Sequence, residues 1–481
     1  YSAGYKIIII LTGMQNSLRS QTQSRIDEEV LGYETSPSII SQFMNNGTEE
    51  AVQNSLGVAK VISNSDVGAI LQSLTNRDEK GDFNKALRAG AFMPPYVIVT
   101  KKVKAPLQHI LGFLSSSTIT LLENGKNVIP VDYPALIIDD EADQASINTK
   151  DEDRDPTTIN GLIRQIINLF KCKSYIGYTA TPFANIFIPH RTKDDVYGQD
   201  LFPKDFIACA PRPELYIGAK EFFGLGDDAD AKPMPLRRVI DKGQDFFNKG
   251  TDDIVPTENL PHELMHAVKC FLISTAVRNL RGQRNKPNTM LVHIIRSIDQ
   301  QDLIKKKLTD YKSYLFDLIK YGDSETRSEL ESLYENDYIE TAKKLRIQFK
   351  KYMDGCIEVD FEAVWNEIIR IVENKELKVW SVNSKSKDGL IYKNHQNEPF
   401  NVIAVGGDKL SRGLTLEGLT ISYFTRAAGA MDTLMQMGRW FGYRHGYLDL
   451  CRLFTTDELF NKFEIISYSV DNLITQFEDM N

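Results

Sequence analysis

The sequence predicts an α/β protein in which two parallel β-sheets are flanked by helices. Continuous apolar runs, typical of buried strands, occur at Lys6–Leu11, Ala135–Ile138 and Asn401–Val405. Segments with helical spacing separate these runs, and strands that alternate with helices form parallel sheets. Because 42% of the 481 residues are hydrophobic, the chain can bury two or three domain cores.

The order of these segments predicts two lobes. We expect a first lobe at 1–200, an irregular connector or accessory segment at 201–285, and a second lobe at 286–481. The strand Thr289–Ile295 opens the second lobe. Residues 300–376, rich in Lys, Glu, Leu and Tyr at helical spacing, predict a helical insertion in this lobe.

An acidic cluster, Asp140-Glu141-Ala142-Asp143, directly follows the apolar run at 135–138. In ATP-driven motors of the P-loop class, carboxylates at the end of a buried strand hold magnesium beside the γ-phosphate. We therefore expect Asp140 to bind Mg²⁺, Glu141 to orient or polarise the attacking water, and Asp143 to belong to the nucleotide site. The alternative is a solvated acidic turn, and three motifs further along the chain favour the nucleotide site.

The first of these motifs is Thr179-Ala180-Thr181, which follows the stretch Ser174–Tyr178. It resembles the Ser/Thr-Ala-Thr motif that follows the acidic box in superfamily 2 helicases. In that family the hydroxyls hydrogen-bond the acidic motif and couple the phosphate state to movement between lobes. The resemblance assigns this role to Thr179 and Thr181.

The second motif, at 407–415, resembles helicase motif V, with the pattern D-x-x-x-R-G intact. Glycines let the backbone approach a phosphate or a base closely. The resemblance implies that Gly407, Asp408, Arg412 and Gly413 bridge ATP and the nucleic-acid strand.

The third motif, at 436–444, resembles helicase motif VI, in which arginines reach the γ-phosphate. The planar guanidinium of Arg suits phosphate, and an arginine finger is worth roughly 10³–10⁵ in rate. Gln436 precedes Gly438 by two residues instead of three, and Arg444 follows Arg439 by five instead of three. We expect Gln436, Arg439 and Arg444 in the catalytic site, with Arg439 as the finger.

Contacts to nucleic acid are predicted at two places in the first lobe. Residues 18–22 follow the first strand and resemble motif Ia, which implies that Arg19 and Gln21 contact the nucleic-acid backbone. Lys101 and Lys102 follow the strand Tyr96–Thr100, where a helicase lobe presents a loop to the nucleic acid. The alternative for these basic residues is a solvated face.

A phosphate-binding loop of the form G-x-x-x-x-G-K-[S/T] does not occur in the sequence. Its backbone amides and its Lys hold the phosphates, so an ATPase of this class needs it. We expect the sequence to be cropped upstream of residue 1. A degenerate ATPase, or a loop supplied by another chain, is the alternative.

Taken together, the motifs and the segment Leu18–Arg25 resemble the Z1-domain proteins, which occur beside restriction-modification and phage-defence genes and are often labelled endonucleases. The resemblance implies two RecA-like P-loop NTPase lobes and a DNA-dependent ATPase or translocase of the superfamily 2 helicase type. It also implies ATP and Mg²⁺ as cofactors and DNA as a partner. A motor of this kind would need a separate nuclease, methyltransferase or other defence subunit to cut or mark DNA.

Composition restricts the remaining possibilities. The net charge of −8 argues against a general basic coat for nucleic acid, although a local basic track is enough for a helicase lobe. The five cysteines lack paired spacing, which indicates free thiols in the cytoplasm. No apolar stretch reaches the roughly 20 residues of a membrane helix. The sequence does not indicate an oligomeric state.

Three other functions remain open on the sequence alone. A restriction-type nuclease would need metal-binding acids and a Glu-x-Lys, for which Asp360, Glu373, Glu376 and Lys378 are candidates. His-Glu-x-x-His at 262–266 could bind zinc from one helix face, but no third-ligand motif follows it. A scaffold with a decayed ATPase is the third possibility, and the intact acidic box and motif V argue against it.

Overall fold

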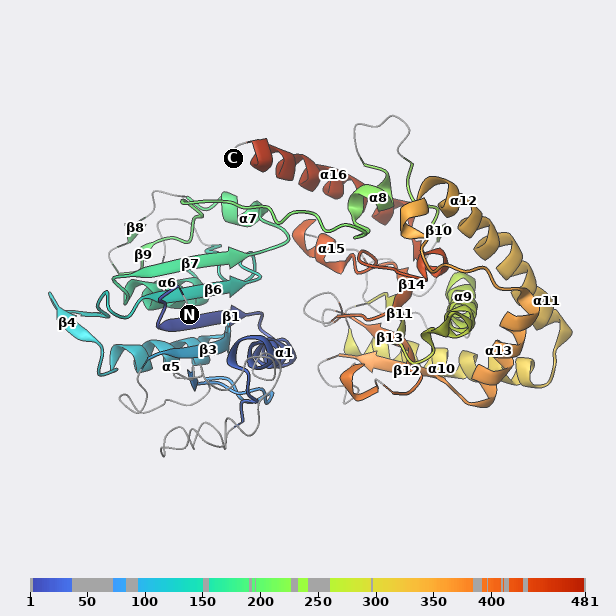
Figure 1. The fold of residues 1–481 in the computed structure, drawn as a ribbon, viewed down its shortest axis with the longest axis horizontal. Helices are drawn as coiled ribbons and strands as arrows, with labels where there is room; N and C mark the ends of the chain where they lie inside the picture. The colour runs from blue at the N-terminus through green and yellow to red at the C-terminus, as the bar shows by residue number, and fades with distance from the viewer. Residues whose placement is uncertain are drawn as a thin grey trace. The chain divides into compact units, whose positions relative to one another are not determined.

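The fold is that of a computed structural model, which describes residues 3–36, 72–83, 94–149, 155–189, 193–194, 196–225, 232–240, 260–295, 297–383, 392–395, 397–407, 410, 415–426 and 431–479. The chain divides into two compact units, Tyr1–Ile207 and Ala208–Asn481. Each unit contains a parallel sheet flanked by helices, which confirms the predicted fold class (Figure 1).

The first unit is built on a five-stranded sheet with the order β2-β3-β1-β6-β7, in which every pair is parallel. Its strands are β1 (Ile7–Thr12), β2 (Gln72–Ser73), β3 (Tyr96–Lys101), β6 (Ala135–Asp140) and β7 (Lys173–Tyr178). Ile7 of β1 lies opposite both Tyr96 and Ala135, so the strands start in register. Their carboxyl ends therefore meet along one edge of the sheet, which is where ligands bind in open parallel sheets.

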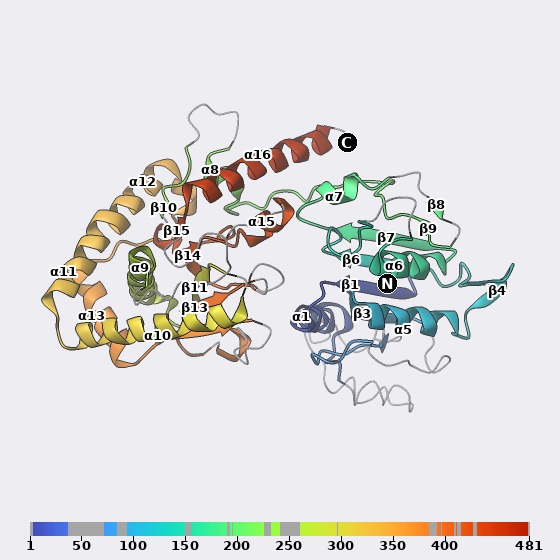
Figure 2. The same cartoon turned by 180° about the vertical axis from the view of Figure 1, so that it is seen from behind.

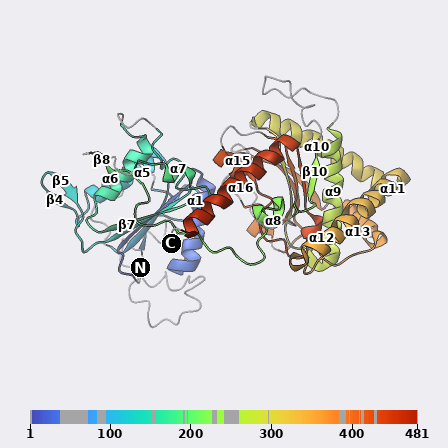
Figure 3. The same ribbon diagram turned by 90° about the horizontal axis from the view of Figure 1, so that it is seen from above.

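Alternate residues of β1 face opposite layers of helices. Ile7 and Ile9 belong to the core beneath α5 (Lys104–Ser115) and α6 (Thr158–Asn168), which pack against each other (Figure 3). Ile8 and Ile10 form a second cluster with residues of α1 (Asn16–Ile26) and of the following turn. A strand that is apolar on both faces is expected in a parallel sheet covered on both sides.

The second unit contains a six-stranded sheet with the order β10-β15-β14-β11-β13-β12, again parallel throughout. Its strands are β10 (Arg237–Val239), β11 (Asn288–His293), β12 (Leu377–Val382), β13 (Asn401–Gly406), β14 (Leu419–Phe424) and β15 (Arg452–Thr455).

One face of this sheet shares its core with a large group of helices, seen from behind in Figure 2. The group comprises α9 (His262–Arg278), α10 (Ile298–Lys320), α11 (Ser324–Leu333), α12 (Glu340–Gln348) and α13 (Phe361–Glu373). A separate core packs α8 (Ala219–Phe223), α15 (Met431–Met437) and α16 (Asp457–Asp479) around Phe424 and Leu453. The segment expected to be a helical insertion is thus helical.

The described residues of the expected connector at 201–285 contribute elements to the second unit. Its strand β10 pairs with β15, and its helix α9 lies in the main core of the second unit. The boundary between units falls after Ile207 because these elements bury their apolar faces against the second sheet. All five cysteines are free thiols. Among the described residues, no helix combines the length and the hydrophobicity needed to cross a membrane.

Candidate active site

The predicted acidic cluster forms a sharp turn at the carboxyl end of β6. Ala142 N–H donates to Tyr178 O of β7 (2.9 Å), so the turn stays attached to the sheet. Glu141 adopts a left-handed backbone conformation, with φ of 55°. For a residue other than Gly this costs about 1 kcal/mol or more, and such strain is concentrated at functional sites.

The side chain of Lys102 binds this turn through its ammonium group. Its ammonium group donates to Asp139 Oδ1 (2.8 Å) and to the carbonyl oxygens of Asp140 (2.7 Å) and Glu141 (2.6 Å). The Lys102 side chain is 0% exposed, as is that of Asp139. The sequence prediction that Lys102 contacts nucleic acid is therefore corrected, because a buried ammonium that is already bonded to three oxygens cannot reach a phosphate.

Asp139 has a second donor on the neighbouring strand. Tyr175 of β7 donates its hydroxyl proton to Asp139 Oδ2 (2.6 Å). Burial, followed by the charge of Asp139, raises the pKa of Tyr175, so the phenol remains a proton donor. Both oxygens of the Asp139 carboxylate thus have donors, as a buried carboxylate requires.

Asp140, the predicted magnesium ligand, has a different environment from Asp139. Burial raises the pKa of its carboxyl group, although the charge of Lys102 opposes this effect. A nearby cation would restore the ionised form. Asp140 and Glu141 offer the carboxylate oxygens that Mg²⁺ prefers, so the donor set at this turn fits that ion.

The Thr-Ala-Thr segment contacts the acidic turn directly. Thr179 Oγ1 donates to Asp143 Oδ1 (2.9 Å), and Thr181 Oγ1 donates to Asp143 Oδ2 (3.0 Å). Thr179 Oγ1 also accepts a hydrogen bond from Thr181 N–H (2.9 Å). The two segments, which are far apart in the sequence, are therefore joined through one carboxylate.

Gly177 lets β7 lie this close to the turn. A Cβ atom at this position would lie 2.9 Å from the Cβ of Ala142, too close for the two segments to keep their positions. Asn185 of α7 (Phe183–Ile186) also donates to Ala142 O (3.2 Å). Both β7 and α7 thus hydrogen-bond the backbone of Ala142 in the turn.

The prediction that Arg19 contacts nucleic acid is also corrected. Its guanidinium is buried and donates to Asn76 O (2.8 Å) and to Asp78 O, which fixes the segment before β3. Lys101 is mostly buried and lies 3.6 Å from the carboxylate of Asp82. Gln21 is exposed on α1.

Of the four motif V residues predicted to bridge ATP and nucleic acid, one lies among the described residues. Gly407 follows β13, whereas Asp408, Arg412 and Gly413 lie outside the described residues.

Motif VI lies at the carboxyl end of α15 in the second unit. Gln436 is in the last turn of the helix, and Arg439 follows it in a turn where its N–H donates to Met437 O (2.9 Å). Trp440 anchors this turn, since its ring packs against those of Phe424 and Phe463 at centroid distances of 5.6 and 4.8 Å.

Arg444 stabilises the same turn in a way that the sequence did not indicate. Its guanidinium donates to the carbonyl oxygens of Trp440 (3.1 Å), Phe441 (3.0 Å) and Tyr443 (2.9 Å). These bonds give Arg444 a structural role in this conformation, in contrast to the predicted role at the γ-phosphate.

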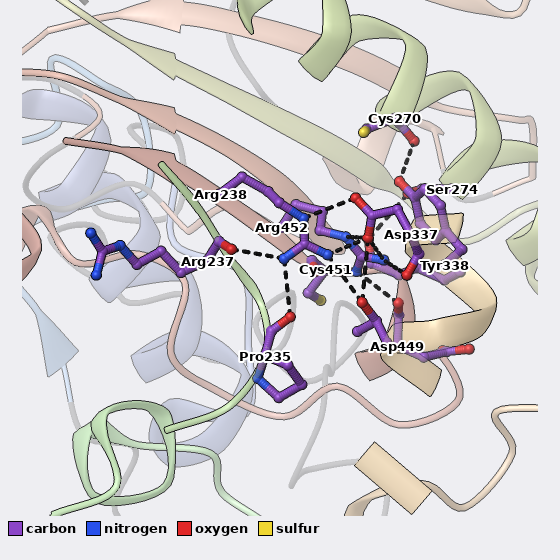
Figure 4. A network of polar contacts seen from close by, with 12 residues as sticks. Pro235, Arg237, Arg238, Cys270, Ser274, Asp337, Tyr338, Asp449, Cys451 and Arg452 are labelled. Atoms are coloured by element: carbon purple, nitrogen blue, oxygen red, sulfur yellow. Dashed lines mark hydrogen bonds and ion pairs between the residues drawn. The ribbon is translucent and has the colours of Figure 1, made fainter. Parts of the chain in front are cut away.

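The second unit also contains a buried charged network (Figure 4). Asp337 accepts from Arg452 Nε (3.0 Å) and Arg238 Nε (2.8 Å), and the Arg452 guanidinium lies 4.2 Å from the centre of the Tyr338 ring. Arg452 also donates to the carbonyl oxygens of Asp449 and Cys451. This network connects β10 and β15 to the helical segment Tyr334–Ile339, which follows α11.

The predicted zinc motif at 262–266 borders this network. Among the described residues, one group of three possible metal ligands lies within 4.8 Å, and it consists of His266, Cys270 and Asp337. Asp337 is already paired with two arginines, and burial raises the pKa of Cys270 to about 12. To bind zinc, this donor set would need Cys270 as a thiolate and an unpaired Asp337 carboxylate, so it does not fit a metal.

The residues considered for a nuclease have other partners. Asp360 accepts from Ala363 N–H and caps α13, and Glu376 pairs with Arg370 and Arg284. Lys378 lies over the rings of Trp380 and Phe400. These contacts stabilise the second unit and do not assemble a metal site.

Two of the residues that organise the acidic turn, Lys102 and Tyr175, were not assigned to it from the sequence. One signal for Lys102 was available, because it directly follows a predicted strand. Carboxyl ends of neighbouring parallel strands meet at one edge, and this could have placed it beside the acidic cluster.

Comparison with known proteins assigns part of the chain. Residues 263–481 match the Z1 domain. No curated protein matches the chain. Among solved structures, the crystal structure of the Hef helicase domain from Pyrococcus furiosus aligns over 95% of each chain, with 12% sequence identity and a TM-score of 0.21. Residues 263–481, which include the β-strands from β11 to β15 and the motif VI segment, are therefore similar to the Z1 domain.

Proposed function

We propose that this chain is an ATP-driven motor of the superfamily 2 helicase type, a DNA-dependent ATPase or translocase that acts in a bacterial restriction or anti-phage defence system. One observation carries the proposal: Asp143 of the acidic turn accepts hydrogen bonds from both Thr179 and Thr181. A solvated acidic turn would not need two hydroxyl donors from a neighbouring strand end.

In this proposal each residue of the turn has its own task. Asp140 holds Mg²⁺, which when bound neutralises charge on the phosphates. Glu141, fixed in a left-handed conformation, orients the attacking water. Asp143 transmits the state of the site to the Thr-Ala-Thr segment. Arg439 of the second unit is the finger that stabilises charge in the transition state.

The candidate nuclease residues indicate whether this chain could cut DNA by itself. Asp360, Glu376 and Lys378 are engaged in structural contacts, so the geometry gives a nuclease function no support. We therefore infer that a separate nuclease, methyltransferase or other defence subunit acts with this motor on DNA.

ATP hydrolysis by the full-length protein, with and without DNA, tests the proposal. Glu141→Gln should retain ATP binding and lose turnover by about 10²–10⁴-fold, because it removes the base but keeps the shape of the side chain. Glu79→Gln, at an exposed position of the same unit, is the matched control and should leave turnover unchanged.

A second variant tests the finger. Arg439→Ala should slow hydrolysis by about 10³-fold or more without unfolding the protein. Wild-type turnover in Glu141→Gln would remove the proposed role of the acidic turn, and an unchanged rate in Arg439→Ala would remove Arg439 as the finger. Absence of turnover from folded full-length protein with DNA would contradict the motor itself.

A further inference from the structure

A cavity of about 350 Å³ lies among three helices of the second unit, away from motif VI. Its walls come from α9, α10 and α11, and α11 contacts both of the other helices (Figure 2). This volume is in the range of sites for small organic molecules. Two of its lining residues, His262 and His266, belong to the rejected zinc motif, and the proposed ATPase function does not use the cavity.

Each helix contributes a different kind of side chain. From α9 come His262, His266 and Lys269, and the two imidazole rings stack with centroids 6.5 Å apart. From α10 come Tyr311 and Tyr314, together with Leu315 and Leu318, which provide an apolar wall.

The third wall is acidic. Asp323, Glu325 and Glu329 lie at and within the amino-terminal part of α11. Glu329 pairs with Lys269 on the opposite wall (2.5 Å), and hydrogen bonds from Thr326 lower the pKa of Asp323. Three carboxylates face a single ammonium group, so the lining has a formal charge of −2 with neutral histidines.

This combination selects against two classes of ligand. An anion such as phosphate would meet the carboxylates, and Asp323 already caps the amino terminus of α11 through Thr326 N–H (2.8 Å). A metal ion would need ligands that converge. Among the described residues, however, the one convergent group of ligands contains His266 but neither His262 nor a carboxylate of α11.

We propose that this cavity binds a small organic cation of the alkylammonium class. The carboxylates of Glu325 and Glu329 would pair with the ammonium groups, and the faces of Tyr311 and Tyr314 would contact the charged alkyl chain through cation–π interactions. The stacked imidazoles accept hydrogen bonds when neutral. Burial lowers the pKa of His266, which favours its neutral form.

Calorimetric titration of the full-length protein with spermidine at physiological ionic strength tests this site. We expect saturable binding with one ligand per chain. Glu329→Gln should weaken binding by about tenfold, because it removes a carboxylate and leaves Lys269 to repel the ligand, whereas Glu325→Gln, which removes a carboxylate alone, should weaken it by about threefold. Tyr314→Ala removes an exposed ring and should weaken binding by about fivefold.

Glu331→Gln is the matched control. It lies on the same helix, is exposed, removes the same charge and does not line the cavity. Unchanged binding in Glu331→Gln beside weakened binding in Glu329→Gln would support the site.

Equal weakening in both variants would show general charge attraction and overturn the proposal. So would absence of saturable spermidine binding. Stoichiometric Zn²⁺ binding that is lost in His262→Ala, without spermidine binding, would replace the proposed organic cation with a metal. Circular dichroism of each variant before titration excludes loss of fold as the cause.

Discussion

Each unit of the molecule contains a buried cation that pairs with an aspartate, Lys102 in the first unit and Arg452 in the second, and these two cations differ in their other partners. Lys102 in the first unit and Arg452 in the second both have 0% exposed side chains, and each pairs with an aspartate. Lys102 also bonds the carbonyl oxygens of Asp140 and Glu141, within the candidate active site. Arg452 instead bonds carbonyl oxygens that precede its own strand and an aspartate from the helical layer.

The comparison shows that a buried cation–aspartate pair can either position a functional site or stabilise a core. A buried ion pair is expensive to form, and breaking it by removing one partner is strongly destabilising. Removal of the carboxylate that pairs with Arg452 should therefore lower the stability of the second unit. Removal of Lys102 should in addition change the conformation of the acidic turn.

The largest effect is expected from Asp337→Asn. This variant leaves the buried Arg452 guanidinium without its carboxylate and should lower the free energy of unfolding of the second unit by about 3–5 kcal/mol. Denaturant unfolding followed by hydrogen exchange in β15 would measure it. Exposed Glu335→Gln, two residues away, is the control. A loss no larger than that of the control would contradict the view that this network holds the core.

A smaller effect, on activity, is expected at Lys102. Lys102→Met leaves Asp139 buried and uncompensated, so both stability and ATP turnover should fall. Adding Asp139→Asn removes the buried charge and should restore stability. Turnover should remain about 100-fold low, because Met cannot bond the carbonyl oxygens that fix the turn.

Unfolding curves and steady-state hydrolysis would separate these two effects. Exposed Lys104→Met is the matched control and should behave as wild type. If the double variant regained both stability and turnover, Lys102 would be structural in the same sense as Arg452.

The contact between the acidic turn and the Thr-Ala-Thr segment gives a third prediction. Thr179→Val and Asp143→Asn should each slow hydrolysis, and their effects should not add. A double-mutant cycle should give a coupling energy of about 1–2 kcal/mol in ATP turnover. Thr149→Val, an exposed position, should show no coupling with Asp143→Asn. Additive effects at Thr179 and Asp143 would separate the two segments functionally.

The smallest effect is a pH dependence of the Arg452 network. Burial alone would raise the pKa of Asp337, but the charges of Arg452 and Arg238 outweigh it, so this pKa lies well below its ordinary value. A depressed pKa in the folded state stabilises the fold above the unfolded pKa of about 3.9, and this contribution is lost as the pH falls further.

The stability difference between the wild type and Asp337→Asn should therefore be constant from neutral pH to about pH 5 and should shrink below about pH 4. Thermal unfolding of both proteins across this range would measure it. A difference that stayed constant down to pH 3 would show that Asp337 does not titrate with the network.

The sequence by itself determined the class of the fold, and it predicted the residues of the candidate active site. Continuous apolar runs identified β1, β6 and β13 because strands covered on both faces need apolar residues at every position. The resemblance of the Thr-Ala-Thr segment to the helicase motif implied a contact with the acidic cluster through hydroxyl groups, and Asp143 accepts those bonds. The resemblance to Z1-domain proteins is confirmed over residues 263–481.

The tertiary structure decided which polar residues are available. Arg19 and Lys102 read as surface cations in the sequence, yet both are buried, because the segment at 76–78 and the acidic turn cover them with carbonyl oxygens. Composition cannot reveal this, since the acceptors are backbone atoms of segments distant in sequence. The unit boundary was also decided in three dimensions, because only pairing with β15 assigns β10 to the second sheet. Local pattern specifies strands and motifs, whereas burial depends on which segments meet.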